Sequence, residues 1–184
     1  MNHSVDQNPG TTFSLPARVL HWLMAAGILA MLFIGVGMVA SVSERHNWLL
    51  AIHKPLGAAL LLLVCIRLIV RLTKGTPPLP ADMPEWQKHV ALASHWLLYL
   101  LMFAMPLIGW AMVSASGTPV TLIGAWTLPA IAPENADVFA VLRTAHRYLA
   151  YLLFATVLLH LAAGLFHGLI RRDGVLTSMV RNRT

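Results

Sequence analysis

One apolar stretch near the C-terminus, Ala145–Ile170, decides the fold of this 184-residue chain; it reads AHRYLAYLLFATVLLHLAAGLFHGLI. It is long enough to cross the hydrocarbon core of a bilayer, which needs about 20 apolar residues. Its histidines, His146, His160 and His167, are separated by 14 (160 − 146) and 7 (167 − 160) residues. At about 100° per residue these separations place all three rings on one stripe of a helix. Ionisable rings are costly in lipid, so we expect this stripe to face the protein interior.

Three further stretches pass the same length test, so four spanning helices are predicted. The chain is 58% hydrophobic and only 11% charged, whereas a soluble domain carries about 25% charged residues. The runs are too long for barrel strands, and helices satisfy their own backbone groups in lipid. We therefore predict an all-α, four-helix transmembrane bundle that forms one integral membrane domain over residues 1–184. The predicted spans are approximately residues 17–40, 50–72, 90–114 and 145–170.

Lysines and arginines near the span ends predict the orientation of the bundle. Nine lie on the side where the first span begins and the fourth ends: Arg18, Arg67, Arg71, Lys74, Lys88, Arg171, Arg172, Arg181 and Arg183. Four lie on the opposite side: Arg45, Lys54, Arg143 and Arg147. Both termini are therefore predicted to be cytoplasmic. The segment Met1–Pro16 lacks the basic region and cleavage site of a signal peptide, so the first span is expected to stay in the protein.

Composition also excludes several classes of protein. The formal charge of +6 is dispersed between apolar spans, and no recognition motif for nucleic acid is present. The single cysteine, Cys65, excludes an internal disulfide, a C-x-x-C-H haem attachment and a Cys₄ iron–sulfur cluster. We interpret Cys65 as a packing residue.

The connections between the spans differ in length. Ser41–Leu49 is predicted to be a short outer turn and Thr73–His89 an inner loop. Ser116–Thr144 is predicted to be a long outer loop that serves as a lid or binding surface, because loops of this length are rarely without function. Its last part, Glu134–Thr144, is expected to form a short helix that feeds the fourth span.

A weak internal repeat relates the first and third spans. Aligned without gaps, His21–Met38 and His95–Met112 match at 8 of 18 positions. The second and fourth spans likewise open with His53-Lys54 and His146-Arg147. We interpret the chain as a duplicated helix pair with parallel halves.

The depth of the histidines in the spans limits which of them can meet. His53 and His146 both lie near the outer ends of their helices, which predicts an outer pair. Near the inner ends, one histidine of the first or third span must meet one of the last two histidines of the fourth. The candidates for this inner pair are His21 or His95 on one side and His160 or His167 on the other. His146 and His160 are about 21 Å apart along a helix axis, so the two pairs lie at different depths.

Pairs of histidines without other donors favour haem iron over a bare metal ion. Zinc and copper sites usually add Cys, Asp or Glu, and no carboxylate lies inside any predicted span. Two imidazoles suit the two axial positions of a haem, whose macrocycle supplies the other ligands. Such ligation leaves no open site on the iron and favours electron transfer. The alternatives are helix-to-helix hydrogen bonding by each histidine, and a non-redox transporter whose histidines bind protons or metal.

Several short motifs resemble the bacterial cytochrome b561 family over roughly residues 14 to 180. They are Leu20-His21-Trp22-Leu23, Ile52-His53-Lys54-Pro55-Leu56-Gly57, Val64-Cys65-Ile66-Arg67-Leu68, Thr76-Pro77-Pro78, Pro106-Leu107-Ile108-Gly109, and Ala145-His146-Arg147 through His160.

The resemblance implies a four-helix protein of the cell inner membrane that holds two haem b groups. It also implies the ligand pairs, with His21 opposite His160 and His53 opposite His146. His95 then remains a non-ligand, as does His167. Members of the family that act as superoxide oxidases take an electron from superoxide at the outer face and pass it to ubiquinone.

Other polar residues near the predicted pairs are candidates for substrate contacts. A quinone needs an apolar slot with one or two hydrogen-bonding groups, and the candidates at the inner end are Ser14, His95 and His167. At the outer end the basic residues Lys54, Arg143 and Arg147 either pair with haem propionates or steer a small anion to the haem edge.

Three functions follow from these features. The first is an oxidoreductase that carries electrons from superoxide to ubiquinone. The second is a cytochrome b subunit that relays electrons between the quinone pool and a dehydrogenase or hydrogenase partner. The third is the non-redox transporter. No nucleic-acid partner is expected.

Overall fold

The computed structural model describes residues 12–180, and helices dominate it. The first two connections between the four long helices are short, and the longer third one contains a two-stranded hairpin. The elements are α1 (Leu15–Val39), α2 (Glu44–Lys74), α3 (Glu85–Ala115), β1 (Val120–Ile123), β2 (Trp126–Leu128), α4 (Ala136–Leu165), the π-helical turn η1 (Phe166–Arg171) and α5 (Val175–Val180). Among the described residues, four helices are long and apolar enough to cross a membrane, the fourth being α4 continued by η1.

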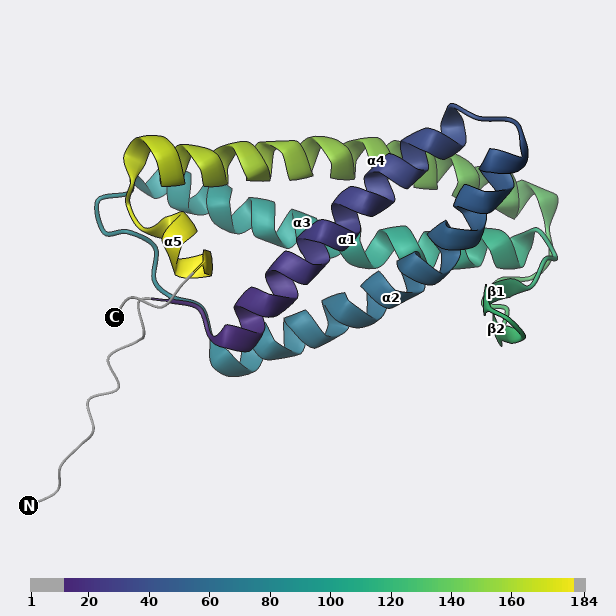
Figure 1. Cartoon of the computed structure of the whole chain (residues 1–184), viewed down its shortest axis with the longest axis horizontal. Helices are drawn as coiled ribbons and strands as arrows, with labels where there is room; N and C mark the ends of the chain where they lie inside the picture. The colour runs from purple at the N-terminus through teal and green to yellow at the C-terminus, as the bar shows by residue number, and fades with distance from the viewer. Residues whose placement is uncertain (1–11, 181–184) are drawn as a thin grey trace, which may run out of the picture.

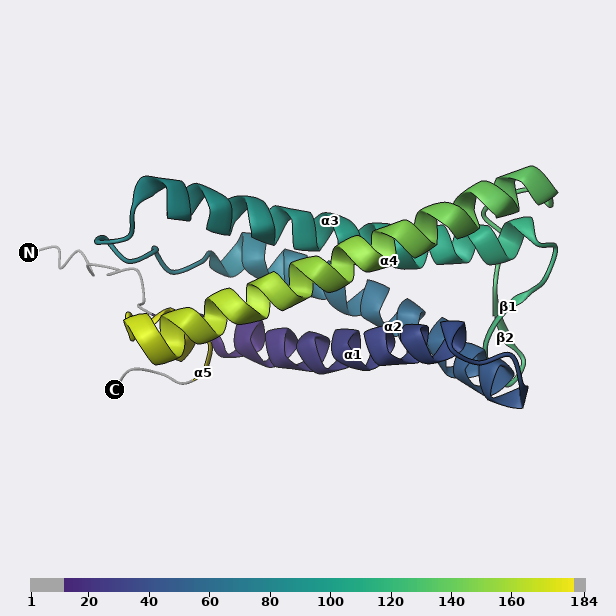
Figure 2. The ribbon, with the colours of Figure 1, turned by 90° about the horizontal axis from the view of Figure 1, so that it is seen from above.

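The long helices form two antiparallel pairs. α1 packs mainly against α2 and α3 against α4, while α2 also contacts α3. Figures 1 and 2 show the two pairs running along one long axis. The end of the bundle with the turn at residues 40–43 and the β-hairpin is called the β-hairpin end. The opposite end, with residues 75–84 and α5, is called the α5 end.

Local sequence explains where the helices begin and end. Asn135 caps α4, because its Oδ1 accepts the backbone N–H groups of Asp137 and Val138. Pro16 stands in the first turn of α1, where a missing N–H costs nothing. α2 ends at Gly75, whose φ of 70° few other residues adopt.

The described core is small and central. Met24 of α1, Val64 of α2 and Tyr99 of α3 form its buried cluster. Many other large apolar side chains are exposed. A bundle whose outside is apolar is suited to contact lipid rather than water.

The helices are longer than the hydropathy pattern predicted. The outer turn expected at Ser41–Leu49 is confined to residues 40–43, and the inner loop expected at Thr73–His89 to residues 75–84. Residues 134–144 do not form a separate short helix, because α4 begins at Ala136 and continues without a break. Hydropathy detects the apolar part of a helix, whereas capping groups set its ends.

The long connection before α4 contains a β-hairpin that the sequence analysis did not predict. Val120 pairs with Leu128, and Trp110 Nε1 of α3 donates to the carbonyl of Pro129 at 2.8 Å. Gly117 has a φ of 71°, and a Cβ there would lie 2.6 Å from Cδ of Glu134. The Trp110 hydrogen bond joins the end of this connection to α3, and β1 packs against both α2 and α3.

The prediction that Met1–Pro16 is not a signal peptide concerns a segment whose first 11 residues lie outside the described part of the chain. Arg181 and Arg183, which entered the orientation argument, also lie outside it.

Candidate haem-binding site

A large cavity lies between the two helix pairs and opens toward the β-hairpin end. Its volume is about 1850 Å³, and its lining comes from all four long helices and from the β-hairpin residues Val120 and Leu128. Pockets for drug-sized ligands are about 300–1,000 Å³, so the cavity has room for a larger group. Most of its lining side chains are apolar.

Two histidines face one another in this cavity. The rings of His53 on α2 and His146 on α4 have centres 6.2 Å apart and planes at 67°. Both rings line the cavity, and Nδ1 of each is buried without a hydrogen-bond partner. Gly109 on α3 leaves space for this pair, since a Cβ there would lie 3.3 Å from Cε1 of His146. We call His53 and His146 the outer couple.

The separation of these rings fits axial ligation of one metal atom. Two metal–imidazole bonds of about 2.0–2.1 Å, each continued by roughly 1.1 Å to the ring centre, put the centres about 6.2–6.4 Å apart. The observed 6.2 Å agrees with this range. Among the described residues, no group of three or more His, Cys, Asp or Glu side chains is arranged to hold a metal ion. A haem fits this donor set, because its macrocycle supplies the remaining ligands.

A second couple lies toward the α5 end. His21 on α1 and His160 on α4 have ring centres 6.2 Å apart, the same separation as in the outer couple. His95 on α3 lies closer to His160, at 5.5 Å, which is shorter than two metal–imidazole bonds require. We call His21 and His160 the inner couple, with His95 as a third ring beside it.

Two arginines that were not predicted to be site residues lie beside the inner couple. Arg67 of α2 donates to the carbonyl of Ala17 and places its other terminal nitrogen 3.1 Å from Nδ1 of His21. The guanidinium of Arg71 lies over the ring of Tyr99, 5.5 Å from its centre. An arginine two turns inside an apolar span is the signal that could have identified Arg67.

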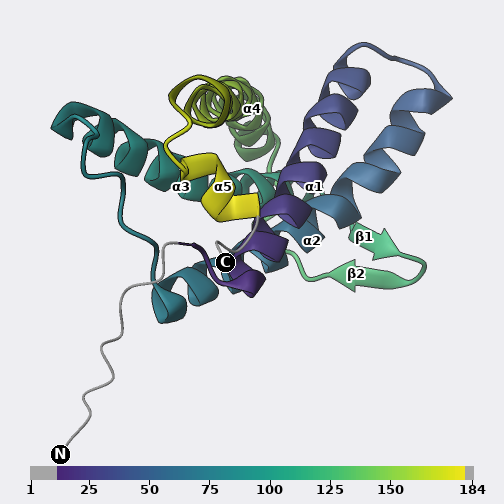
Figure 3. The same cartoon turned by 60° about the vertical axis from the view of Figure 1, so that its left-hand side comes forward.

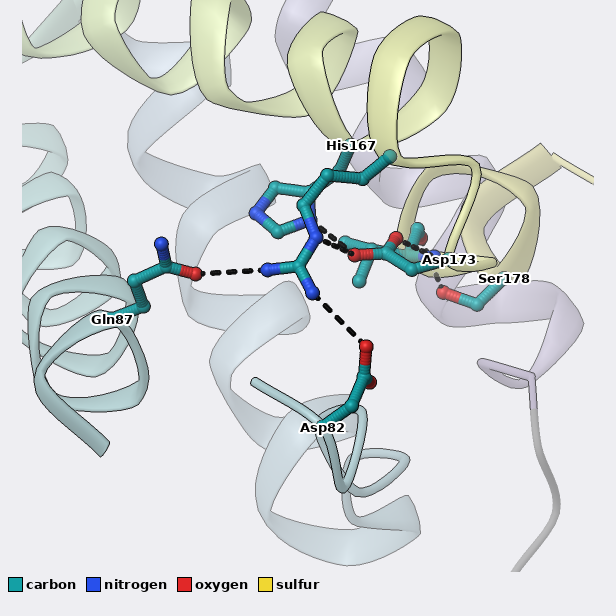
Figure 4. A network of polar contacts seen from close by, with 7 residues as sticks. Asp82, Gln87, His167, Asp173 and Ser178 are labelled. Carbon is teal, nitrogen blue, oxygen red and sulfur yellow. Dashed lines mark hydrogen bonds and ion pairs between the residues drawn. The ribbon is translucent and has the colours of Figure 1, made fainter. Parts of the chain in front are cut away.

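His167, the last histidine of the stripe, does not join the couples. It lies on η1, where Nδ1 hydrogen-bonds to Oδ2 of Asp173. Arg172 adopts a left-handed conformation with φ 54°, and the chain then turns so that Asp173 comes beneath the ring. Figure 4 shows this contact, with Gln87 and Asp82 nearby. Arg171 donates hydrogen bonds to the side chains of Gln87 and Asp82. Sequence reasoning missed Asp173, because only the chain reversal brings it to His167.

The Asp173 side chain is buried, with 8% of it exposed. Burial by itself raises the pKa of this carboxyl, but hydrogen bonds from His167 and from the backbone N–H of Val175 lower the pKa further than burial raises it. The net shift of the pKa is downward. The ionised Asp173 carboxylate therefore stabilises the folded protein at neutral pH. This stabilisation is lost only when the pH falls through the lowered pKa.

Ser14 lies at the same end, near α5. Its hydroxyl is buried and has no hydrogen-bond partner among residues 12–180. The neighbouring backbone N–H of Phe13 donates to the carbonyl of Ser178, and Trp22 Nε1 donates to that of Met179. Figure 3 shows α5 beside the first turns of α1. Ser14 and His167 thus share the region around α5, whereas His95 lies against His160.

The three basic residues predicted for the outer end line the cavity at the β-hairpin end. Lys54, Arg143 and Arg147 are all part of its lining. Within residues 12–180, none of them forms an ion pair with a carboxylate. We call these three residues the basic rim.

Facing imidazoles on separate helices of a membrane bundle define a class of protein, the helical membrane cytochromes. The chain belongs to one family within it: the sequence model of prokaryotic cytochrome b561 matches residues 12–182. The protein is therefore a multi-pass protein of the inner membrane, and it belongs to a family of haem b proteins of electron transport.

Named relatives agree with this family. Cytochrome b561 homolog 1 of Escherichia coli K12 is 26% identical over 179 residues, covering 93% of this chain and 98% of the relative. A Yersinia pestis protein named probable superoxide oxidase CybB is 31% identical over 165 residues, covering 88% and 91%. Cytochrome b561 homolog 2 of Escherichia coli K12 is 29% identical over 180 residues, covering 94% and 93%.

Proposed function

We propose that the protein holds two haem b groups, one on each couple, and carries electrons from superoxide at the β-hairpin end to ubiquinone at the α5 end. The observation that carries this proposal is the equal separation of 6.2 Å in two couples, His53–His146 and His21–His160, at opposite ends of α4. The excess of basic residues at the α5 end supports a cytoplasmic position for both termini.

The ligand arrangement limits what the iron does. His53 and His146 would hold one haem at the cavity, and His21 and His160 would hold the other toward the α5 end. A haem held by two histidines would supply a one-electron redox centre, and such ligation favours electron transfer over oxygen binding. Gly109 keeps the ring of His146 free to take its position.

The basic rim supports superoxide as the donor. Positive side chains around a cavity with apolar walls attract a small anion and raise its rate of encounter. Lys54, Arg143 and Arg147 line the cavity that contains the outer couple. The name of the Yersinia pestis relative, probable superoxide oxidase, is consistent with superoxide as the electron donor.

The α5 end supports quinone as the acceptor. The Ser14 hydroxyl is buried without a partner and is available to a ligand carbonyl. Asp173 holds Nδ1–H of His167, which leaves Nε2 of that ring to hold or deliver a proton. Two superoxide anions, one quinone and two protons then yield two oxygen molecules and one quinol. The two protons enter at the α5 end, and His95 serves as packing beside His160.

A second candidate is the cytochrome b subunit that passes electrons between the quinone pool and a dehydrogenase or hydrogenase partner. The names of the two Escherichia coli relatives state the cytochrome b561 family without a superoxide activity, which is compatible with this second function. A docking surface for such a partner would lie at the α5 end, where Arg171 ties the 75–84 loop to η1 through Asp82.

The test is superoxide-driven reduction of ubiquinone by the purified protein. We expect a b-type α-band in the reduced-minus-oxidised spectrum, reduction of that band by superoxide, and quinol formation. An absent α-band would exclude both redox functions and leave the transporter. A normal α-band without reduction by superoxide would favour the second candidate.

A further inference from the structure

Arg67 stands in a position that iron ligation by His21 does not permit. One terminal nitrogen donates to the Ala17 carbonyl, and the other lies 3.1 Å from Nδ1 of His21. A guanidinium carries donors only, so Nδ1 must be the acceptor in this contact. The remaining nitrogen, Nε2, then carries the proton of the neutral ring.

Ligation reverses this assignment. A neutral imidazole that binds iron through Nε2 carries its proton on Nδ1, and that N–H normally donates to a carbonyl or carboxylate. Two donors cannot share a hydrogen bond, so the Arg67 guanidinium must release His21 when the iron binds. A charged donor freed inside a membrane bundle needs an acceptor, because leaving it unpaired is costly.

The neighbourhood of Arg67 contains further unmatched donors. Arg71 lies one turn further along α2, with its guanidinium over Tyr99. The Tyr99 hydroxyl is buried and has no hydrogen-bond partner. A small cavity is lined by Arg67, Arg71 and Tyr99. Within residues 12–180, neither arginine forms an ion pair with a carboxylate.

The cavity has a volume of only about 10 Å³, so a carboxylate site would form from the two guanidinium groups and the hydroxyl once Arg67 has released His21. Charged donors bind carboxylates more strongly than neutral ones, and arginine does so with two parallel bonds. Haem b carries two carboxylates, its propionates, at one edge. We propose that Arg67, with Arg71 and the Tyr99 hydroxyl, binds a propionate of the inner haem. This inference rests on the proposed role of His21 as an iron ligand.

The site distinguishes the inner haem from the outer one. Positive charge beside a haem favours its reduced form, which carries one positive charge fewer on the iron. Arg67 would therefore raise the midpoint potential of the inner haem. The Arg67 guanidinium would also bind the phosphate of an anionic lipid headgroup. The experiment therefore has to distinguish a bound haem propionate from a bound phosphate.

The experiment compares Arg67→Gln with the unaltered protein, both purified with their haem. Resonance Raman spectra report the bending mode of the haem propionates, and a redox titration reports the two midpoint potentials. We expect the propionate mode of one haem to shift and one midpoint potential to fall, while the other potential stays constant. Tyr99→Phe should give a smaller shift in the same mode.

The matched control is Arg172→Gln. Arg172 lies at the same end, but its Nε donates only to the carbonyl of Leu169, so neither readout should change. If Arg67→Gln fails to accumulate, Arg67→Lys takes its place. It retains the charge but not the paired bonds, so it should shift the propionate mode and leave the potential nearly unchanged.

The outcomes separate this inference from the proposed function. A propionate mode that is unchanged in Arg67→Gln and Arg67→Lys would overturn the inference. An unaltered protein that binds a single haem would overturn the role of His21 and His160 instead. Two bound haems with an unshifted mode would overturn the propionate site alone.

Discussion

The two ends of α4 use the same ligand type in different surroundings. At the β-hairpin end, His146 and His53 line a large cavity whose rim is basic. At the α5 end, His160 and His21 are packed against a third imidazole and a guanidinium, and α5 covers the start of α1. The ring separation is 6.2 Å in both couples. Ring separation therefore sets the ability to hold a metal, and the surroundings set what can reach it.

The largest expected effect comes from removing a single ligand. His53→Ala or His146→Ala should reduce the haem content from two to one per chain, and His21→Ala or His160→Ala should do the same for the other haem. The measurement is the pyridine haemochrome content of purified protein. His95→Ala is the control and should keep both haems, because its ring lies too close to His160 for a metal between them. Loss of a haem in that variant would instead assign His95 to the inner couple.

A second variant acts on the outer couple alone. Gly109→Val places a branched side chain where a Cβ is already 3.3 Å from His146, and overpacking of this kind costs about 1–3 kcal/mol. We expect the outer haem to be lost or weakened while the inner one is retained. Gly164→Val is the matched control, because a Cβ at Gly164 meets nothing within 4 Å. Equal haem loss in the two variants would mean that helix propensity, rather than crowding of His146, is responsible.

The basic rim should affect the rate of electron entry without affecting haem content. Replacing Lys54, Arg143 and Arg147 together by Gln should slow reduction by superoxide by about 10-fold or more at low salt, with a weaker dependence on ionic strength. Stopped-flow absorbance at the α-band measures this rate. Arg45→Gln is the control, since Arg45 lies at the same end outside the cavity lining. An unchanged rate and salt dependence in the triple variant would remove the steering role.

The smallest effect is expected at the α5 end. Asp173→Asn removes the charged hydrogen-bond partner of His167. Loss of about 1 kcal/mol from this hydrogen bond corresponds to a roughly 5-fold lower rate of quinone reduction. Quinone reduction should slow by that amount, while reduction of haem by superoxide stays constant. Because the pKa of Asp173 is held below its usual value, its carboxylate stays charged from about pH 5 to 8, and the ratio of the two rates should be constant over that range.

Asp82→Asn is the control for this variant. Asp82 bonds to Arg171 and has no contact with His167, so quinone reduction should keep its normal rate. If Asp82→Asn and Asp173→Asn slow the reaction equally, the network acts by holding the 75–84 loop to η1, and a specific role for Asp173 is wrong.

Prediction from the sequence succeeded where a repeating pattern carried the information. The length of apolar runs predicted the four membrane helices, and the motifs around His21, His53 and His146 predicted the cytochrome b561 family; the structure and the family match confirm both. The ligand pairs remain predictions, although the ring separations agree with them.

Other features had no pattern to reveal them. The β-hairpin at residues 120–128 is too short for a strand periodicity, and the start of α4 at Ala136 depends on the cap at Asn135. Arg67 could be recognised as an unusual charge in a span, but its contact with His21 depends on how α1 packs against α2.

The sequence by itself determined that the chain has four helices long and apolar enough to cross a membrane. It also placed histidines at two depths in these helices, because helix length and residue spacing follow directly from the order of residues. Only the tertiary structure decided that His160 has two neighbouring rings, that Asp173 turns back to His167, and that Arg67 meets His21. These contacts join residues from different helices or across a chain reversal, so they depend on packing angles and helix ends that no local pattern specifies.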